Sequence, residues 1–457
     1  MLRNIIRRLS PGKIIILAYV LGIIVFTLLL KLPISLKPGV KLPFIDALFT
    51  AASAVSVTGL TTIGTSDTFS IFGIFMLMAA FQFGGVGIMT LGSFYWLMMG
   101  QNIGLLERKL IMIDQNRSQL AGLVKLMKVV LVLTLTIELT GTVLFGVYFY
   151  ATGYTDSLPY ALFNGMFHTV SAFTNAGFDL FGDSLLRYSK DYFVQTFTML
   201  LIILGAIGFP VMAELWEFVR SRRRGARNKD RPFRFSLFTK VTLITHVILL
   251  FLGAAIIWLT EAGHSFAHMP LHQQLMNSLF TSVTSRSAGL TIVDVSSLHH
   301  ATLLLISGLM FLGASPSSMG GGIRTTTIAI IVLVILSYAR GERVPRAFSR
   351  SISMEDVIKS FVFFTLAVLL VLIGIFAVFM SEAHQFDLSA VLFEVASAFG
   401  TCGLSTGITG SLHRGSKVTL IILMFIGRIG MFLFISLFSS GKRKPDIRYP
   451  EEKLIIG

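Results

Sequence analysis

The chain has few charged residues and almost no cysteine. Of its 457 residues, 13% are Asp, Glu, Lys or Arg, whereas 54% are hydrophobic. Together with a mean hydropathy of +0.79, this composition excludes an ordinary soluble globular protein and is typical of a polytopic membrane protein. The single cysteine, Cys402, excludes an intrachain disulfide and leaves redox chemistry and thiolate metal sites without support.

Apolar runs long enough to cross a bilayer, which takes about 20 residues, are plentiful. Eight of them lie at residues 14–30, 70–99, 122–150, 192–218, 237–259, 301–338, 358–380 and 418–438. The basic segment before the first run has no small-residue cleavage site, so we expect a retained first helix rather than a signal peptide. The sequence therefore predicts an all-α membrane protein with eight spans.

Positive charge is concentrated on one side of these runs. Of the 38 Lys and Arg residues, 28 lie in segments 1–13, 101–128, 220–240, 340–359 and 441–457, and seven lie on the other side. By the positive-inside rule, both termini are then cytoplasmic. Anionic lipid head groups explain the basic run at residues 220–234, so we expect membrane lipids and no nucleic acid as partners.

Four short segments, VTGLTT, TNAGFD, RSAGLT and GTCGLS, share a central glycine. These glycines, Gly59, Gly177, Gly289 and Gly403, are 118, 112 and 114 residues apart. The spacing predicts a unit of about 110 residues that is repeated four times. We expect the repeats to occupy residues 1–100, 101–220, 221–340 and 341–441, followed by a cytoplasmic tail at 442–457.

An apolar stretch that is too short to cross the membrane precedes each of these glycines. It opens with Pro43, Pro159, Pro270 or Asp387, residue types suited to the start of a helix. A phenylalanine recurs nine or ten residues before each glycine, at Phe49, Phe167, Phe280 and Phe393. Each repeat is therefore predicted to be a helix, a half-helix that enters the membrane from outside, a glycine loop and a second helix.

The glycine loops carry the chemistry of the predicted site. Non-helical backbone is tolerated at membrane depth only where it is buried in protein or lines water, and glycine allows successive carbonyls to point toward one axis. The C-termini of four half-helices add partial negative charge at the centre, which favours a dehydrated monovalent cation. The predicted filter residues are Val57, Thr58, Gly59, Asn175, Ala176, Gly177, Ser287, Ala288, Gly289, Thr401, Cys402 and Gly403.

The loops, their spacing and the segment SPSSMGGGIRTTT resemble the Trk/Ktr/HKT superfamily of potassium transporters, and most closely the bacterial Ktr-type membrane subunit. The resemblance covers the chain from about residue 14 to 440. It implies that the glycines line a K⁺ filter. It also implies that Gly59 confers K⁺ selectivity, since members with serine at this position tend to admit Na⁺. No loop has the TVGYG of potassium channels, so we expect a shorter and less selective filter.

The third repeat contains GASPSSMGGGIRTTT at residues 313–327, inside the apolar run from Ala301 to Tyr338. Its three glycines and its proline must interrupt the helix. A simple kink is the alternative, but the length of the run and its hydroxyl groups favour an intramembrane loop below the filter. The resemblance implies that this loop is the gate.

Arg428 lies in the middle of the last predicted span. An arginine at this depth costs at least ~2.5 kcal/mol unless it faces water or a partner. We therefore expect it to face the pathway and to donate to carbonyls of residues 314–322. The resemblance also assigns this arginine to the gate, whose predicted residues are Gly313, Ala314, Ser315, Gly320, Gly321, Gly322, Arg324 and Arg428.

Smaller signals have simpler interpretations. Glu138, in an apolar run, is either a coupling site or one end of a hydrogen bond between helices, and Arg286 is predicted to brace the third loop by donating to backbone carbonyls. Pro270 interrupts the helical spacing of three histidines, so we expect no transition-metal site at His264, His268 and His272. Close helix packing is predicted at Gly84, Gly85, Gly87, Gly205 and Gly208.

These features favour channel-like K⁺ uptake across the bacterial cytoplasmic membrane. K⁺ is the expected cargo, Na⁺ is left open as an activator or co-ion, and no organic cofactor is expected on this chain. The resemblance further implies a homodimer on a cytoplasmic ring of regulatory subunits with nucleotide-binding Rossmann-like domains.

Two rival functions remain. A secondary transporter of another cation or small solute would use alternating access, but its commonest design has inverted repeats, whereas these repeats are parallel. An intramembrane enzyme needs a nucleophile with a base, or a metal cluster, in the spans, and the sequence has no such set. We therefore expect that the protein is not an enzyme.

Overall fold

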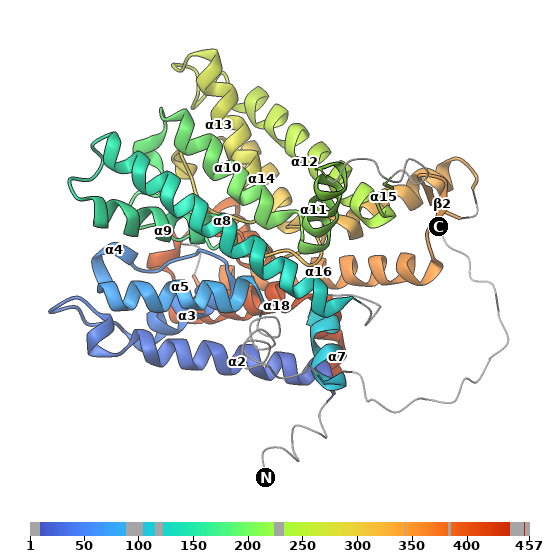
Figure 1. The fold of residues 1–457 in the computed structure, drawn as a ribbon, viewed down its shortest axis with the longest axis horizontal. Helices are drawn as coiled ribbons and strands as arrows, with labels where there is room; N and C mark the ends of the chain where they lie inside the picture. Colours follow the sequence, from blue (N-terminus) through green and yellow to red (C-terminus); the bar gives the residue numbers. More distant parts are fainter. Residues whose placement is uncertain are drawn as a thin grey trace, which may run out of the picture.

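The computed structural model describes residues 10–87, 104–114, 122–223, 233–342, 344–382, 385–438 and 452. These residues are almost entirely helical (Figure 1). The described strands are β1 (Arg346–Ala347) and β2 (Arg350–Ser351), which form one short antiparallel pair. The expectation of an all-α polytopic membrane protein is confirmed.

Each repeat contributes the same three main elements. The first helices are α2 (Pro11–Leu30), α8 (Leu123–Ala151), α12 (Leu237–Glu261) and α16 (Met354–Ser381). The short helices that follow are α3 (Phe44–Ser56), α9 (Leu158–Thr174), α13 (Leu271–Thr284) and α17 (Leu388–Gly400). The second helices begin with α5 (Ile71–Gly85), α10 (Tyr192–Ala206), α14 (His300–Leu312) and α18 (Arg414–Phe438).

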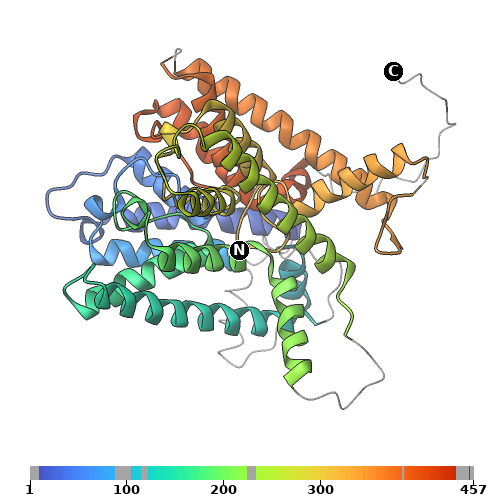
Figure 2. The same cartoon turned by 90° about the horizontal axis from the view of Figure 1, so that it is seen from above.

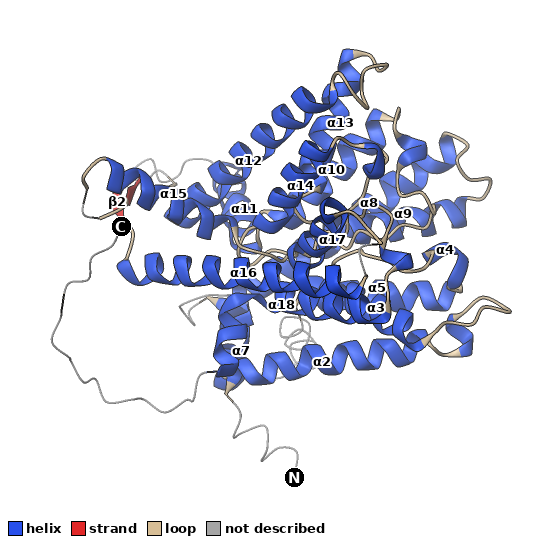
Figure 3. Cartoon of the chain, turned by 180° about the vertical axis from the view of Figure 1, so that it is seen from behind, coloured by secondary structure: helices blue, strands red, loops and turns tan. Residues whose placement is uncertain are grey.

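Further short elements connect these helices. They are α4 (Thr65–Thr68), α7 (Leu105–Asp114), α11 (Phe209–Arg223), α15 (Thr325–Ala339), and the 3₁₀ turns η1 (Pro33–Ser35), η2 (Leu186–Tyr188), η3 (Val295–Ser297) and η4 (Thr409–Ser411). Figure 3 shows α7 and α15 toward one end of the bundle and α4 at the opposite end.

The repeats close into a ring through the short helices. Each short helix packs against the first helix of its own repeat. Each second helix also packs on the short helix of the next repeat: α5 on α9, α10 on α13, α14 on α17, and α18 back on α3. The first helices follow the same order, with α2 and α12 on opposite sides in Figure 1 and the teal α8 and orange α16 on opposite sides in Figure 2.

Five of the predicted spans are confirmed as single helices. The helices α2, α8, α12, α16 and α18 are long and apolar enough to cross a membrane. The run at 301–338 is divided into α14 and α15, as its glycines predict. Of the run at 70–99, α5 covers residues 71–85, and residues 88–99 lie outside the described part of the chain.

The prediction of one continuous span at residues 192–218 is wrong. The axes of α10 and α11 differ by 107°. Gly208, between them, has φ +94°, a conformation that ends a right-handed helix and that glycine adopts without strain. Pro210 then suits the first turn of a new helix. Of the predicted fourth span, only the part in α10 therefore runs in the expected direction.

Candidate functional site

The four predicted filter glycines meet at the centre of the ring. All four have positive φ: 94° at Gly59, 73° at Gly177, 69° at Gly289 and 96° at Gly403. A β-carbon built on Gly59 would lie 2.6 Å from the carbonyl oxygen of Ala176 and 2.9 Å from the Cα of Gly177. The chain therefore needs glycine here both for its backbone angles and for space.

The same contact is repeated around the ring. A β-carbon on Gly177 would meet the carbonyl oxygen of Ala288, one on Gly289 that of Cys402, and one on Gly403 that of Thr58. In each case the carbonyl belongs to the residue just before the next repeat's glycine. Four equivalent carbonyl groups are thus brought into one closed ring, in chain order.

The short helices end directly at these loops. In three repeats the helix is terminated by a left-handed residue, Val57, Asn175 or Thr401, at φ 57°, 59° and 47°. The third repeat differs, because Ser285 after α13 is right-handed and the N–H groups of Ser287 and Ala288 both donate to the carbonyl of Thr284. The C-terminal, negative ends of all four short helices therefore face the ring.

Hydroxyl groups of the short helices hold each loop, and the sequence analysis missed them. The Oγ atoms of Ser53 and Ser397 each accept a hydrogen bond of 3.1 Å, from the N–H of Gly59 and Gly403. Ser171 and Thr284 instead donate to the carbonyls of Phe178 and Leu290, at 2.6 Å. The sequence contains a pattern that could have identified these residues, because each of them lies four positions after the recurring phenylalanine.

The predicted gate residues lie immediately beside the filter. The loop from Gly313 to Arg324 connects α14 and α15. The N–H of Gly321 donates to Oγ1 of Thr401 over 2.8 Å, and a β-carbon on Gly320 would lie 2.7 Å from Cβ of Ser287. The loop and two filter residues are therefore in direct contact.

The loop is also bonded to the second helices of other repeats. Backbone N–H groups of Ser315 and Met319 donate to the carbonyls of Ala206 and Gly205 in α10, each over 3.1 Å. The N–H of Gly322 donates to the carbonyl of Gly427 in α18 over 3.2 Å. These bonds fix the loop across the centre of the molecule.

Arg428 is buried and points at this loop. Its Nη1 donates to the carbonyl of Met319, which lies within the predicted range of partners. Its Nη2 donates to the carbonyls of Gly84 and Gly85 at the end of α5, which the sequence analysis did not anticipate. Arg324 donates to the carbonyls of Gly320, at 2.5 Å, and Ser315, at 3.4 Å. Both arginines thus hold the loop through its carbonyl groups.

A motif that the sequence analysis did not recognise as a repeat lies against the C-terminal parts of the short helices. It is Gly-x-Val/Ile-Gly, at residues 84–87, 205–208 and 427–430, and Arg428 occupies its second position in the fourth repeat. A β-carbon on its first glycine would collide with a carbonyl of a short helix, that of Val55, Phe173 or Phe399. Its last glycine has φ 95°, 94° and 81° in the three copies.

This motif explains why three second helices break at the same level. Its first glycine allows the second helix to touch the short helix of its own repeat. Its last glycine, Gly87, Gly208 or Gly430, then ends or kinks the helix. The prediction of close helix packing is confirmed for Gly84 and Gly205.

Other predicted contacts turn out differently. Arg286 does donate to a backbone carbonyl, but this carbonyl belongs to His246 of α12, at 3.0 Å, and its other bond goes to the His246 ring at 2.6 Å. The third loop is therefore tied to α12.

Glu138 accepts a hydrogen bond from Gln82 of α5, as the second of its two interpretations predicts. Within the described residues, no group of three or more His, Cys, Asp or Glu side chains is placed to hold a metal ion.

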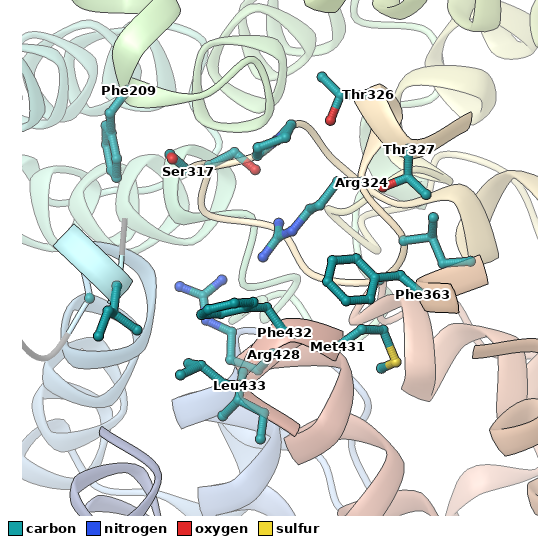
Figure 4. Close-up of a pocket in the computed structure, with 18 of the residues that line it drawn as sticks. Phe209, Ser317, Arg324, Thr326, Thr327, Phe363, Arg428, Met431, Phe432 and Leu433 are labelled. Carbon is teal, nitrogen blue, oxygen red and sulfur yellow. The ribbon is translucent and has the colours of Figure 1, made fainter. Parts of the chain in front are cut away.

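A cavity of about 130 Å³ lies beside the loop from Gly313 to Arg324. The loop contributes Pro316, Ser317 and Ser318, α18 contributes Arg428 and the residues after it, and α15 contributes its first turn. Figure 4 shows the guanidinium groups of Arg324 and Arg428 pointing toward each other in this cavity.

The fold and this ring of loops define a polytopic membrane protein of four pseudo-symmetric repeats around a central ion pathway. The chain belongs to the TrkH family of cation transport proteins, whose model matches residues 14–444. It is therefore a cation transporter and not an enzyme. The resemblance noted from the sequence is confirmed.

Two relatives and one solved structure show the extent of this similarity. The chain is 49% identical to the Ktr system potassium uptake protein D of Bacillus subtilis (strain 168), over 99% of both chains. It is 32% identical to the potassium/sodium uptake protein NtpJ of Enterococcus hirae, over 100% of this chain and 99% of the relative. The crystal structure of the potassium transporter TrkH from Vibrio parahaemolyticus matches with a TM-score of 0.71 and 19% identity, covering 95% of this chain and 86% of that one, which supports the fold.

Proposed function

We propose that the protein is a channel-like K⁺ uptake system of the bacterial cytoplasmic membrane. The observation that carries this proposal is the closed ring of four glycine loops, in which four equivalent carbonyl groups are buried at the ends of four short helices. Carbonyl oxygens replace the hydration shell of a monovalent cation, and the negative helix ends lower the free energy of the cation there.

The choice of K⁺ as cargo rests on two supports. The relative from Bacillus subtilis is named for potassium uptake and shares almost half of its residues with this chain. Gly59 stands at the filter position where serine would imply Na⁺ passage. The proposed filter consists of the twelve residues around Gly59, Gly177, Gly289 and Gly403 that the sequence predicts.

We further propose that the loop from Gly313 to Arg324 is the gate. It lies against Ser287 and Thr401 on one face, and Arg428 holds it from the other. Opening requires that these hydrogen bonds break. A fixed positive charge at this level also repels a cation that leaves the filter.

We propose that both termini lie in the cytoplasm. We also propose that the four repeats occupy residues 1–100, 101–220, 221–340 and 341–441. The word "system" in the relative's name fits a second component. We propose a homodimer on a cytoplasmic ring of nucleotide-binding, Rossmann-like subunits. Of the basic segments proposed for that face, residues 1–9 and, apart from residue 452, the tail at 442–457 lie outside the described residues.

The second candidate function is a transporter that moves Na⁺ as well as K⁺ or couples the two. The name of the relative from Enterococcus hirae, which includes both ions, favours it. Alternating access would require the ring of loops to come apart in each cycle. In the channel-like proposal, by contrast, the ring of loops stays intact and only the gate moves.

Growth and K⁺ uptake of a bacterial strain that lacks its own K⁺ transport test the proposal. The chain should be expressed with and without a Ktr-type regulatory subunit, in medium with and without Na⁺. We expect uptake that follows external K⁺ and increases when the subunit is present. Uptake of Na⁺ that equals uptake of K⁺ would favour the second candidate.

A further inference from the structure

The cavity below the gate loop has the wrong charge for a cation. Among the described residues that line it, the charged ones are Arg324 and Arg428, and no carboxylate is among them. Two guanidinium groups that share one cavity without a counter-charge destabilise each other, and a buried charge that lacks a partner is costly. Their hydrogen bonds to backbone carbonyls satisfy donors but neutralise no charge.

Helix ends add to this positive potential. The first-turn residues Thr326 and Thr327 of α15 line the cavity, and the N-cap residue Arg324 offers no side-chain acceptor to that turn. Phe209, the first residue of α11, lines it as well. The N-terminus of a helix carries partial positive charge, which favours anions. The N–H groups of Phe209 and Thr327 already donate to the carbonyls of Ser317 and Arg324, so these helix ends contribute through their charge. The filter, by contrast, faces helix C-termini.

Two buried polar atoms of the lining have no partner. They are Nε of Arg428 and Oγ of Ser318, which belong to residues that are each 7% exposed. Buried donors in a folded protein are normally satisfied, so each such atom indicates a missing acceptor. Their residues line the cavity, although these two atoms are themselves covered by protein.

The size of the cavity sets the size of the occupant. A cavity of about 150 Å³ accommodates a molecule as large as benzene, so the 130 Å³ here suffices for a tetrahedral oxyanion. Guanidinium groups bind such anions through charge-assisted, often bidentate hydrogen bonds. The hydroxyl group of Thr327 is suited to another oxygen of the anion.

We propose that this cavity binds a phosphate-class oxyanion, either free phosphate or the phosphate of an anionic lipid. The anion accepts from Arg324 and compensates the charge of both guanidinium groups. This inference rests on the proposed function for one consequence only: the occupied site lowers the barrier to K⁺ below the filter and competes with the gate loop for Arg428. Binding itself requires only the cavity.

Binding is tested on the purified full chain in lipid-free detergent. Thermal unfolding is followed while potassium phosphate replaces potassium gluconate at constant K⁺ and ionic strength. We expect the unfolding temperature to rise with phosphate until it saturates. The apparent affinity for phosphate should be at least about tenfold weaker in Arg324→Gln, because this change removes one charge-assisted hydrogen bond. The control Arg187→Gln removes an exposed arginine that pairs with Asp183 away from the cavity, and should titrate as the wild type does. No phosphate effect, or an equal effect in Arg324→Gln, would overturn the proposal.

A second arm identifies the source of the phosphate group. Phosphatidylglycerol is titrated into the same micelles in place of phosphate. Stabilisation that depends on Arg324 with the lipid but not with free phosphate assigns the site to a lipid head group, and the reverse assigns it to the free ion. If neither effect depends on Arg324, the site does not exist.

A third arm separates this inference from the proposed function. K⁺ flux into liposomes is measured with phosphate or gluconate on the cytoplasmic side. We expect several-fold more flux with phosphate in the wild type and no such difference in Arg324→Gln. If K⁺ flux occurs but does not change with phosphate, the proposed effect on the barrier is wrong. If no K⁺ flux occurs under any condition, the proposed function is wrong, and the binding experiment alone decides whether the anion site exists.

Discussion

Gly59 shows how a single residue couples the loops of different repeats. Its φ of 94° requires glycine, and a β-carbon there would press on Ala176 and Gly177 of the next loop. A side chain at this position therefore displaces a carbonyl of the neighbouring repeat as well as its own. The sequence predicts that these four loops form a filter, but it does not predict that each glycine makes room for the next repeat.

Replacing Gly59 by serine should lower K⁺ selectivity before it lowers transport. Only one of four loops is strained, so the ring should stay partly intact while Na⁺ passes. Rb⁺ uptake competed by Na⁺ measures the change, and Gly403→Ser should behave in the same way. Gly308→Ser is the matched control, since Gly308 has open space beside it and no positive φ. An unchanged K⁺ preference in both filter variants contradicts the filter assignment.

Arg428 gives the second prediction at this scale. Its charge-assisted bonds to the carbonyls of Met319, Gly84 and Gly85 contribute about 1.5–3 kcal/mol each. Arg428→Ala should therefore favour the open gate and raise K⁺ flux about tenfold or more, as measured in liposomes. A well-folded Arg428→Ala protein that conducts less than the wild type would place the gate elsewhere.

The partners of Arg428 also show where sequence reasoning ends. Its depth in an apolar span and the glycine-rich loop predicted Met319 as a partner within residues 314–322. Gly84 and Gly85 lie more than 300 positions away in the sequence, and no local pattern connects them to Arg428. The partner of Arg286 was missed for the same reason, since His246 reaches it only through the packing of α12 on α13.

Among the elements, the contact between α18 and α3 closes the ring. Lys417 of α18 and Asp46 of α3 form an ion pair of 2.9 Å, with side chains only 10% and 12% exposed. This pair joins the fourth repeat to the first. Removing one partner leaves an uncompensated charge in a nearly dry site.

We expect Lys417→Met to destabilise the protein by about 3–5 kcal/mol, the usual cost of breaking a buried pair. The double variant Asp46→Asn with Lys417→Met should regain much of this loss, because no unpaired charge remains. Unfolding in detergent, monitored by temperature, compares the two. If the single and double variants were equally unstable, the charge pair would not be what holds the ring closed.

The gate loop allows a test at the level of an element. Deleting Gly320 and Gly321 shortens the loop and removes the bonds to Thr401 and Arg324. K⁺ flux in liposomes should rise, because the loop can no longer lie across the centre. Lower flux through a folded protein would show that the loop supports the filter instead of closing it.

Hydrophobic runs predicted most elements but not their directions. The run at 358–380 became part of one helix, α16, because it is mostly apolar and its one glycine, Gly374, does not adopt a positive φ. The run at 192–218 is equally apolar, yet Gly208 turns α11 by 107°. The repeated Gly-x-Val/Ile-Gly motif signals such a break, and it is recognised only when three distant segments are aligned.

For the whole molecule, the proposed function implies control by a partner. An always-open K⁺ path would be harmful to a cell, and a ligand on a partner can move the proposed gate only if it binds the open and closed states with different affinity. The segments that we propose to be cytoplasmic carry 28 Lys and Arg residues, which suits an acidic partner surface.

Removing the tail after Gly441, or neutralising Arg222, Arg223 and Arg224, should weaken assembly with a separate regulatory ring and abolish nucleotide control of flux. Neither change alters the sequence of the four glycine loops, so K⁺ selectivity should be unchanged. Co-purification at graded salt concentrations measures the assembly. Assembly and nucleotide-dependent flux that survive both changes would place the control site on another surface.

We propose that K⁺ passes through the ring of four glycine loops and is selected there. The reversal potential of the purified chain in a bilayer, with K⁺ on one side and an equal concentration of Na⁺ on the other, tests this proposal most directly. We predict a reversal potential far from zero in the wild type, with the sign that opposes flow of K⁺ out of the K⁺ side, and a clear shift toward zero in Gly59→Ser. A wild-type reversal potential at zero, or one that Gly59→Ser leaves unchanged, would contradict it.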